Sequence, residues 1–306
     1  MMLPVLLNPA ARRATRVHAY LHAFLRAGLH PTLTTATRDD QLDDLAAHAA
    51  GRGARVIAAA GGDGTLGLVA TALTGTGIAL AVLPLGTGNT FARNLHVPRH
   101  PRALARAIVQ GRTRDIDVGI VQGRAFLNSV TLGVSSGVAR ALRGGIKRRL
   151  GLLAYPLVGL PALVRERPRT YDLTLDGRPL RLHTAQLILA NADDVARRLR
   201  IPGADYEDGQ LVLVSVRGRT PLGLLLHGLR WWFGDTRALR VQRFRTLHLR
   251  AHDGAPLTAN IDGDLLSAPA LHVEVRARAL RVVAADPHPQ GPFIPFTTIR
   301  ARNPRR

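Results

Sequence analysis

The sequence predicts an α/β fold: a doubly wound α/β domain at the N-terminus, followed by a β-sandwich domain. Two observations lead to this prediction. Over roughly the first 120 residues, short apolar runs alternate with amphipathic helical stretches, which is the spacing of βαβ units around a parallel sheet. From about residue 116 the pattern changes to short strands separated by turn residues, as in a sandwich. We therefore expect domains at 1–125 and 126–286, and a basic, proline-rich tail at 287–306.

The elements of the first domain follow from its periodicity. The run Leu3–Leu7 has the length of a buried strand, and Ala14–Ala27 carries apolar residues at helical spacing. The same alternation predicts further strands at Thr32–Thr35, Arg55–Ala60 and Ile78–Leu83, and further helices at Asp39–Ala50, Thr65–Leu73, Asn89–Asn94 and Pro101–Gln110.

The second domain is expected to be rich in β-strands. Ile116–Val121 and Ala125–Val130 resemble a hairpin, Gly137–Val164 is helical or mixed, and Thr220–Phe233 is a helix. We expect the tail to be irregular, with room to pack back on the first domain. The other predicted strands are Tyr171–Leu175, Leu180–Ala190, Gln210–Val216, Leu239–Arg245, Thr246–Ala251, Leu257–Ile261, Ala270–Arg276 and Leu280–Ala284.

Composition limits the classes of function. The 306 residues include no cysteine, which excludes disulfides and cysteine nucleophiles and fits the cytoplasm. The net charge of +21 favours polyanionic partners, although a GC-rich genome that favours arginine codons would give the same excess. Only 4% of residues are aromatic and no known nucleic-acid-binding motif is present, so we expect no nucleic-acid partner. The longest uncharged run, Leu150–Val164, is too short and too broken to span a bilayer.

Glycine-rich turns follow two of the predicted strands. Gly61-Gly62-Asp63-Gly64-Thr65 follows one, and Gly86-Thr87-Gly88-Asn89 follows the next; Asn8-Pro9 follows the first strand of the chain. The carboxyl ends of neighbouring parallel strands share one crevice. Glycines there allow a phosphate to approach the backbone and the N-terminus of a helix. The sequence thus predicts a nucleotide site, in which Asp63 orients Mg²⁺ or bonds a hydroxyl or a backbone group.

This pair of motifs resembles the diacylglycerol kinase catalytic-domain family, which includes bacterial lipid kinases and sphingosine and ceramide kinases. The resemblance covers nearly the whole chain. It implies an ATP- and Mg²⁺-dependent kinase that phosphorylates the hydroxyl of a lipid alcohol such as diacylglycerol, with a place in phospholipid metabolism. The residues it implies at the nucleotide are Asn8, Pro9, Thr35, Gly61, Gly62, Asp63, Gly64, Thr65, Leu66, Gly67, Thr87, Gly88 and Asn89.

Two groups of carboxylates stand out in the second domain. Asp205, Glu207 and Asp208 precede a strand, either as an ordinary acidic turn or, as the resemblance implies, as a structural Mg²⁺ site. That site would use the Asp208 side chain and the main-chain oxygens of Asp205 and Gln210.

The second group is Asp262-Gly263-Asp264, either a hairpin turn or the match of the family's Asp-Gly-Glu. The resemblance implies that its acidic residue accepts the proton of the lipid hydroxyl. Asp264 is one methylene shorter than the family's glutamate. Either Asp264 still serves as the base, after a small backbone shift, or Asp262 takes over part of the role. Asp63 is a further catalytic candidate. A second departure is Thr90, where the family often has aspartate.

A lipid kinase must reach a membrane, and two stretches suit peripheral binding to an anionic surface. One is the basic segment Arg140–Arg149. The other is Leu222–Phe233 with Trp231 and Trp232, although ordinary helix packing would also explain it. Two other functions stay open: a NAD kinase-like phosphotransferase on a soluble substrate, and a non-catalytic nucleotide- or polyanion-binding protein.

Overall fold

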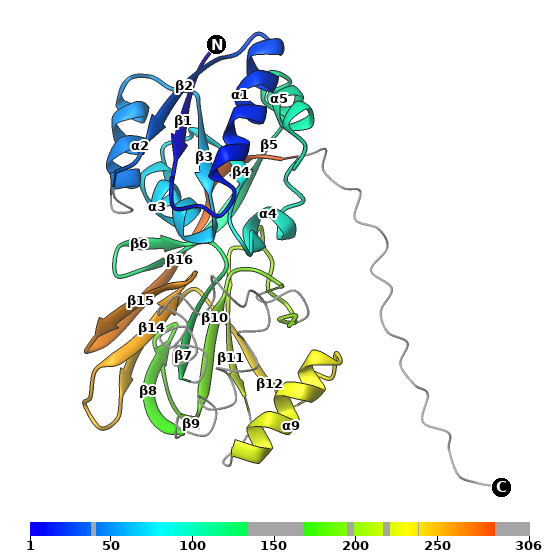
Figure 1. The fold of residues 1–306 in the computed structure, drawn as a ribbon. Coiled ribbons are helices and arrows are strands. Elements are labelled where there is room, and N and C mark those ends of the chain that lie inside the picture. The colour runs from blue at the N-terminus through cyan, green and yellow to red at the C-terminus, as the bar shows by residue number, and fades with distance from the viewer. Residues whose placement is uncertain (38–40, 134–167, 195–198, 217–220, 238, 285–306) are drawn as a thin grey trace, which may run out of the picture.

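The computed structural model describes residues 1–37, 41–133, 168–194, 199–216, 221–237 and 239–284 (Figure 1). It confirms the predicted fold class: an α/β domain lies above a β-sandwich domain in the view of Figure 1. The predicted segment Gly137–Val164 and the tail 287–306 lie outside the described residues.

The first domain is built on four parallel strands in the order β2-β1-β3-β4. Helices cover both faces. α1 and α5 pack on one face through residues such as Phe24 and Leu104, and α2 and α3 pack on the other. The elements are β1 (Met2–Leu7), the short 3₁₀ helix η1 (Ala14–Arg16), α1 (Val17–Arg26), β2 (His30–Thr35), α2 (Leu42–Gly51), β3 (Val56–Gly61), α3 (Asp63–Leu73), β4 (Ala79–Pro84), α4 (Thr90–Asn94) and α5 (Pro101–Val109).

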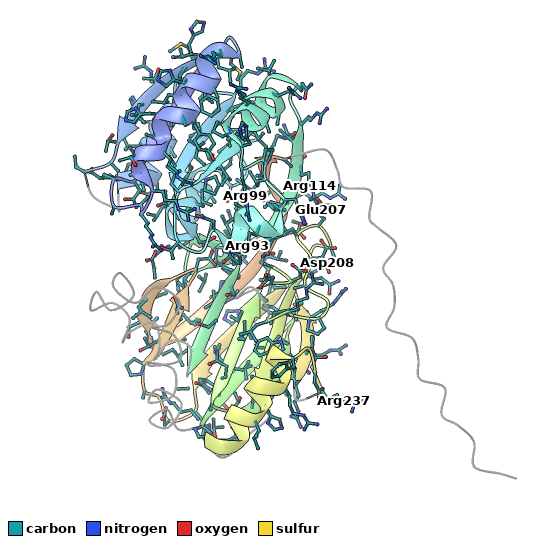
Figure 2. All side chains as sticks on the ribbon, turned by 45° about the vertical axis from the view of Figure 1, so that its right-hand side comes forward. Arg93, Arg99, Arg114, Glu207, Asp208 and Arg237 are labelled. Atoms are coloured by element: carbon teal, nitrogen blue, oxygen red, sulfur yellow. The ribbon has the colours of Figure 1, made fainter. Side chains whose placement is uncertain are left out.

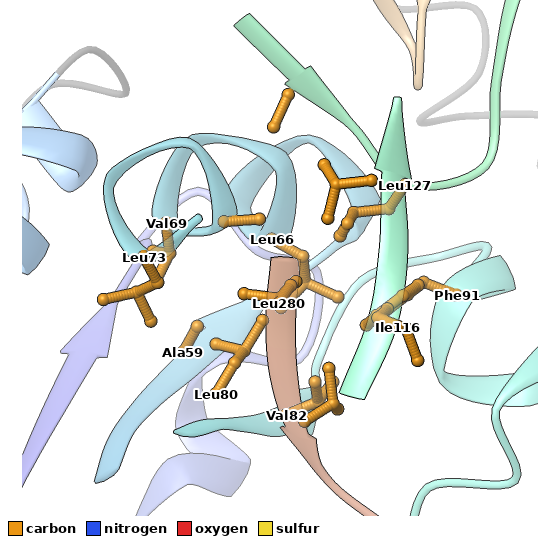
Figure 3. Close-up of a cluster of buried hydrophobic side chains, with 14 of the residues drawn as sticks. Ala59, Leu66, Val69, Leu73, Leu80, Val82, Phe91, Ile116, Leu127 and Leu280 are labelled. Carbon is orange, nitrogen blue, oxygen red and sulfur yellow. The ribbon is translucent and has the colours of Figure 1, made fainter. Parts of the chain in front are cut away.

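The helix that follows the first glycine turn is held firmly by the core. β3 is buried along its whole length, as expected for a strand covered by helices on both faces. Figure 3 shows Leu66, Val69 and Leu73 of α3 packed around Leu80 and Leu280, and all five side chains are fully buried. The start of α3, where the glycine turn ends, therefore has a fixed position.

The sheet of the first domain continues into the second. β4 pairs in parallel with β16 (Ala270–Val283), which pairs in turn with β5 (Thr113–Val121) and with β13. The resulting sheet has ten strands, in the order β2-β1-β3-β4-β16-β13-β8-β9 with β5 and β6 off this path. Its other strands are β6 (Arg124–Phe126), β8 (Arg169–Leu175), β9 (Arg178–Thr184) and β13 (Thr246–Ala251).

A second sheet completes the sandwich. Its six strands are in the order β12-β11-β10-β7-β14-β15, and large apolar residues such as Phe126 and Phe244 fill the space between the sheets. α9 (Pro221–Trp232) packs on its outer face through Trp231. The strands are β7 (Ser129–Gly133), β10 (Gln186–Ala190), β11 (Leu211–Val216), β12 (Leu239–Phe244), β14 (Leu257–Ile261) and β15 (Asp264–Ala268).

Several predicted boundaries in the second domain are wrong. The run Leu180–Ala190 divides at Ala185 into β9 and β10, which belong to different sheets, and Ala125–Val130 divides into β6 and β7. Conversely, Ala270–Arg276 and Leu280–Ala284 are parts of a single strand, β16, whose pairing with β5 shifts in register between Arg276 and Leu280. β15 was not predicted. Among the described residues, no helix has the length and apolar character to cross a membrane.

Candidate active site at the domain junction

The two glycine turns touch through their backbones. A Cβ on Gly86 would lie 2.4 Å from Gly62 Cα, and a Cβ on Gly61 would lie 2.3 Å from Thr65 Oγ1. The N–H groups of Leu85 and Gly86 both donate to Gly61 O. A side chain at Gly86 would push the turns apart, and one at Gly61 would collide with Thr65, so glycine is required at both positions.

Asn89 shapes the second turn from within. It has a left-handed backbone (φ 49°), and its Oδ1 accepts a hydrogen bond from Gly86 N at 2.9 Å. Its Nδ2 donates to the carbonyls of Pro84 and Gly86. The Asn89 side chain thus fixes the shape of the turn, and it would hold a phosphate only through the backbone that it organises.

The first loop is tied to the first glycine turn. Asn8 Nδ2 donates to Thr65 Oγ1 at 3.0 Å, and Asn8 Oδ1 accepts from Ala10 N at 2.9 Å. The side chain of Leu66 is buried in the core, so it offers a nucleotide only its backbone. Pro9, Thr35 and Thr87 are exposed at the same end of the sheet. The structure therefore brings the predicted nucleotide residues to one edge, as the parallel register of β1, β2, β3 and β4 requires.

Asp63 bonds the backbone, which is one of the options expected for it. Its two carboxylate oxygens accept from Thr90 N at 3.1 Å and Phe91 N at 3.0 Å, the first N–H groups of α4. Asn128 Nδ2 approaches the same carboxylate at 3.5 Å, and a Cβ on Gly88 would lie 3.1 Å from it. Asp63 therefore holds α4 and the second glycine turn in place. Thr90 takes part through its N–H, which any non-proline residue provides.

Asp262 is likewise occupied by backbone donors. At the tip of the β14–β15 hairpin, its carboxylate accepts from Leu127 N at 2.6 Å, Asn128 N at 3.0 Å and Ser129 N at 2.9 Å. Burial raises the pKa of Asp262 to about 6, although the three N–H groups favour the ionised form. This aspartate fixes the hairpin to the segment that joins the domains.

Asp264 has a different environment. Its carboxylate pairs with Arg124, and its side chain is 45% exposed. A Cβ on Gly64 would lie 3.4 Å from Asp264 Oδ2. Asp264 thus lies against the first turn of α3, across the domain junction.

Four further polar residues at the junction were missed by the sequence analysis. Asn128 links Asp63 to Tyr206, whose hydroxyl donates to Asn128 Oδ1 at 3.4 Å. Burial raises the pKa of Tyr206 well above its usual value. Asn191 Nδ2 donates to Asp117 O at 2.9 Å, and Asp117 is fully buried. Asp117 could have been identified from the sequence, because it is a charged residue inside the apolar run Ile116–Val121.

The predicted metal residues lie on the loop before β11, on the side of the junction that Figure 2 shows with Arg114, Glu207 and Asp208 labelled. Asp208 Oδ1 accepts from Gln210 N at 3.0 Å, whereas Oδ2 is buried without a hydrogen-bond partner and lies 3.4 Å from Arg243 Nη1. Burial raises the pKa of Asp208, and the carboxylates of Asp205 and Asp117 add to that effect.

A buried carboxylate oxygen without a hydrogen-bond partner fits an oxygen-binding cation such as Mg²⁺, and the Arg243 guanidinium already supplies part of the countercharge. The described part of the chain has no cluster of three or more Asp, Glu, His or Cys side chains suited to a metal.

The candidate membrane segments give a mixed result. Trp231 is only 5% exposed and its Nε1 donates to Arg200 O at 2.8 Å. Trp231 therefore packs inward, which agrees with the alternative of ordinary helix packing. Phe233, just after α9, is 81% exposed. The side chain of Trp232 and the segment Arg140–Arg149 lie outside the described residues.

Fold and site together define a two-domain protein with glycine-rich turns facing a carboxylate of a β-sandwich. Comparison with known proteins agrees: residues 2–121 match the diacylglycerol kinase catalytic domain, and residues 128–284 match the YegS C-terminal NAD kinase beta sandwich-like domain. The chain belongs to the diacylglycerol kinase catalytic-domain family.

Individual relatives carry kinase names. The chain is 34% identical over 279 residues to "Probable lipid kinase YegS-like" of Pseudomonas aeruginosa, covering 87% of this chain and 88% of the relative. It is 32% identical over 220 residues to diacylglycerol kinase of Bacillus subtilis, covering 70% and 73%. A crystal structure of a diacylglycerol kinase from Bacillus anthracis superimposes with a TM-score of 0.69 at 18% identity, covering 93% and 97% of the two chains. Membership of a kinase family implies the use of ATP.

Proposed function

We propose that this protein is an ATP- and Mg²⁺-dependent lipid kinase that phosphorylates the hydroxyl of a lipid alcohol such as diacylglycerol. The observation that carries the proposal is the position of Asp264. Of the three candidate catalytic aspartates, Asp63 and Asp262 each accept hydrogen bonds from two or more backbone N–H groups. Asp264 has a side-chain partner and lies against Gly64 at the start of α3.

The geometry suits phosphoryl transfer, which needs positioning and charge stabilisation more than covalent chemistry. The turns at 62–64 and 87–88 offer backbone N–H groups and the N-terminus of α3 to the phosphates of ATP. A lipid hydroxyl that enters from the sandwich side would meet Asp264. The hydroxyl oxygen bonds to the γ-phosphorus, its proton passes to Asp264, and the bond to the bridging oxygen breaks with its electrons leaving on ADP.

Two aspartates receive positioning roles in this proposal. Asp63 holds the two glycine turns and α4 together, and Asp262 holds the hairpin that carries Asp264. Mg²⁺ would be held at the loop before β11 by Asp208 and the main-chain oxygens of Asp205 and Gln210, where it would add to the countercharge of the partly buried Asp208 carboxylate.

The lipid substrate implies contact with a membrane, and we propose that the protein binds anionic membranes peripherally. Support comes from the net charge of +21 and from the apolar side chains exposed at α9. The relatives named as lipid kinases favour this substrate class over NAD or another soluble alcohol.

The experiment that tests the proposal measures transfer of labelled γ-phosphate from ATP to a panel of lipid alcohols in mixed micelles, with NAD as a soluble acceptor. Labelled lipid should form with Mg²⁺ and disappear when Mg²⁺ is chelated. Asp264→Asn should lower kcat by about 100-fold or more, the size typical of a lost proton acceptor. Asp253→Asn changes an exposed carboxylate elsewhere in the sandwich and is the matched control.

Three results would count against the proposal. Transfer to NAD alone would favour the soluble-substrate alternative. ATP binding without transfer to any acceptor would favour a non-catalytic role. Full activity of Asp264→Asn would remove Asp264 from the chemistry.

A further inference from the structure

Arg124 connects hairpins of the two domains. It lies at the start of β6, and its Nη2 donates to Oδ2 of Asp264 at the start of β15. The two residues are 140 positions apart in the sequence, so the tertiary fold alone brings them together. Neither residue is fully covered: their side chains are 33% and 45% exposed. The ion pair is therefore within reach of a ligand bound at the junction.

The pair lies beside the expected phosphate site. The Asp264 carboxylate is in van der Waals distance of the position that a Cβ of Gly64 would occupy, in the first turn of α3. A carboxylate and a triphosphate that meet at the same helix N-terminus repel each other. A cation must lie close to both, and Arg124 is already bonded to the carboxylate.

The bond to Asp264 uses only part of the hydrogen-bonding capacity of Arg124. Its Nε is buried and has no hydrogen-bond partner. A guanidinium carries five N–H donors in a planar fork that matches two oxygens of a phosphate. Because Nε is closed to a ligand, a phosphoryl oxygen at the glycine turns would bind the Nη groups of the partly exposed side chain, while Nη2 keeps its bond to Asp264.

We propose that Arg124 donates through the Nη groups of its guanidinium to the γ-phosphoryl group of ATP and at the same time positions Asp264 for the lipid hydroxyl. This inference rests on the proposed kinase activity. Arg124 keeps its proton throughout: the hydroxyl proton goes to Asp264, and the electrons of the broken P–O bond leave on ADP. The arginine offsets the charge of both groups, and it holds the short aspartate side chain against Gly64.

Nucleotide binding tests the phosphate contact without any lipid. Calorimetry compares ADP with a non-hydrolysable ATP analogue that carries a γ-phosphate. Arg124→Gln should weaken binding of the analogue by about 10- to 100-fold, the range of a charge-assisted hydrogen bond, and change ADP binding by less than about threefold. Arg124→Lys keeps the charge without the fork and should fall between. Arg169→Gln removes an exposed ion pair with Asp253 and should bind both nucleotides as wild type does.

Kinetics test the link to Asp264. Arg124→Gln should lower kcat by about 100-fold and leave the lipid KM within about threefold, because the contact matters most in the transition state. The double variant Arg124→Gln/Asp264→Asn should be no slower than the slower single variant. Added guanidinium should restore part of the kcat of Arg124→Ala and none of that of Asp264→Asn.

The outcomes separate this inference from the proposed function. If wild type phosphorylates no lipid, the kinase proposal fails, and the nucleotide comparison still decides the phosphate contact. The inference is overturned if Arg124→Gln keeps wild-type preference for the ATP analogue over ADP, or if wild type has no such preference. Equal loss of both nucleotides would show a structural role only. If circular dichroism shows that Arg124→Gln is unfolded, Arg124→Lys provides the same comparison.

Discussion

At the scale of single residues, hydrogen-bond partners separate aspartates that look alike in sequence. Asp262 and Asp264 are two positions apart, yet one is surrounded by backbone N–H groups and the other by an arginine. A carboxylate that holds several backbone donors is costly to move, because each donor would lose its partner. Asp262 therefore suits a positioning role, and Asp264 suits proton transfer.

The raised pKa of Asp262 predicts a pH dependence of stability. Its pKa is about 6 in the folded protein and near 4 when unfolded. Between these values the folded state binds more protons, so the free energy of unfolding should fall as pH rises from about 4 to about 6. The loss from this one group is at most about 3 kcal/mol. Asp262→Asn should lack this contribution.

Urea unfolding of wild type and Asp262→Asn at several pH values provides the measurement. Asp253→Asn is the control, because Arg169 lowers the pKa of that exposed carboxyl and its removal leaves the slope between pH 4 and 6 in place. An identical slope in wild type and Asp262→Asn would show that Asp262 titrates normally.

At the scale of elements, the glycine turns depend on close contact between backbones. A Cβ on Gly86 would meet the backbone of Gly62, which has no flexible side chain to move aside. Gly86→Ala should therefore separate the turns and weaken ATP binding by about 10-fold or more, as the loss of a charge-assisted hydrogen bond would. Gly51→Ala is the control, because a Cβ at the end of α2 would have no neighbour within 4 Å.

Calorimetry with ATP checks this prediction. Gly51→Ala should bind ATP as wild type does and be as stable or slightly more so. Unchanged ATP binding by Gly86→Ala would show that the close approach of the two turns does not shape the nucleotide site.

The surface at α9 is the described candidate for membrane contact. Leu226 on α9 is 51% exposed and Phe233, just after the end of the helix, is 81% exposed; Arg230 lies between them in the sequence. Replacing both apolar residues with serine should reduce binding to vesicles that contain anionic lipid. Leu25→Ser, at a similarly exposed leucine of α1, is the control. Equal vesicle binding by wild type and the double variant in a flotation assay would exclude α9 as the docking surface.

At the scale of the whole molecule, β16 joins the two domains into one sheet. It pairs with β13 in the sandwich and with β4 and β5 in the first domain. Asp117 secures the position where its register shifts, because its buried carboxylate accepts from Arg278 N and Gly209 N. We therefore expect the domains to unfold together.

Leu280→Ala tests this expectation. Leu280 is fully buried in the core of the first domain, so its loss should cost about 2–5 kcal/mol. Both tryptophans lie in the second domain, and their fluorescence should report the same lowered midpoint as hydrogen exchange of β3 in the first. Two separate midpoints would show that the domains unfold independently. Val241→Ala, at an exposed position of β12, should leave the midpoint nearly unchanged.

The sequence by itself determined the local features: the alternation of strands and helices, the two glycine turns and the change to a sandwich. These depend on neighbouring residues, since periodicity and turn chemistry act over a few positions. The division of Leu180–Ala190 between two sheets could not be predicted from the sequence, because the segment has no glycine or proline to mark a break at Ala185.

Only the tertiary structure decided how the carboxylates differ. Asp63 bonds residues 27 and 28 positions away, Asp262 bonds residues more than 130 positions away, and Arg124 meets Asp264 across 140 positions. The same residue type can accept backbone N–H groups, an arginine or a metal, and its choice depends on which distant segments fold beside it. The sequence therefore indicated which residues belong to the site, and the tertiary structure showed the contacts that distinguish one carboxylate from another.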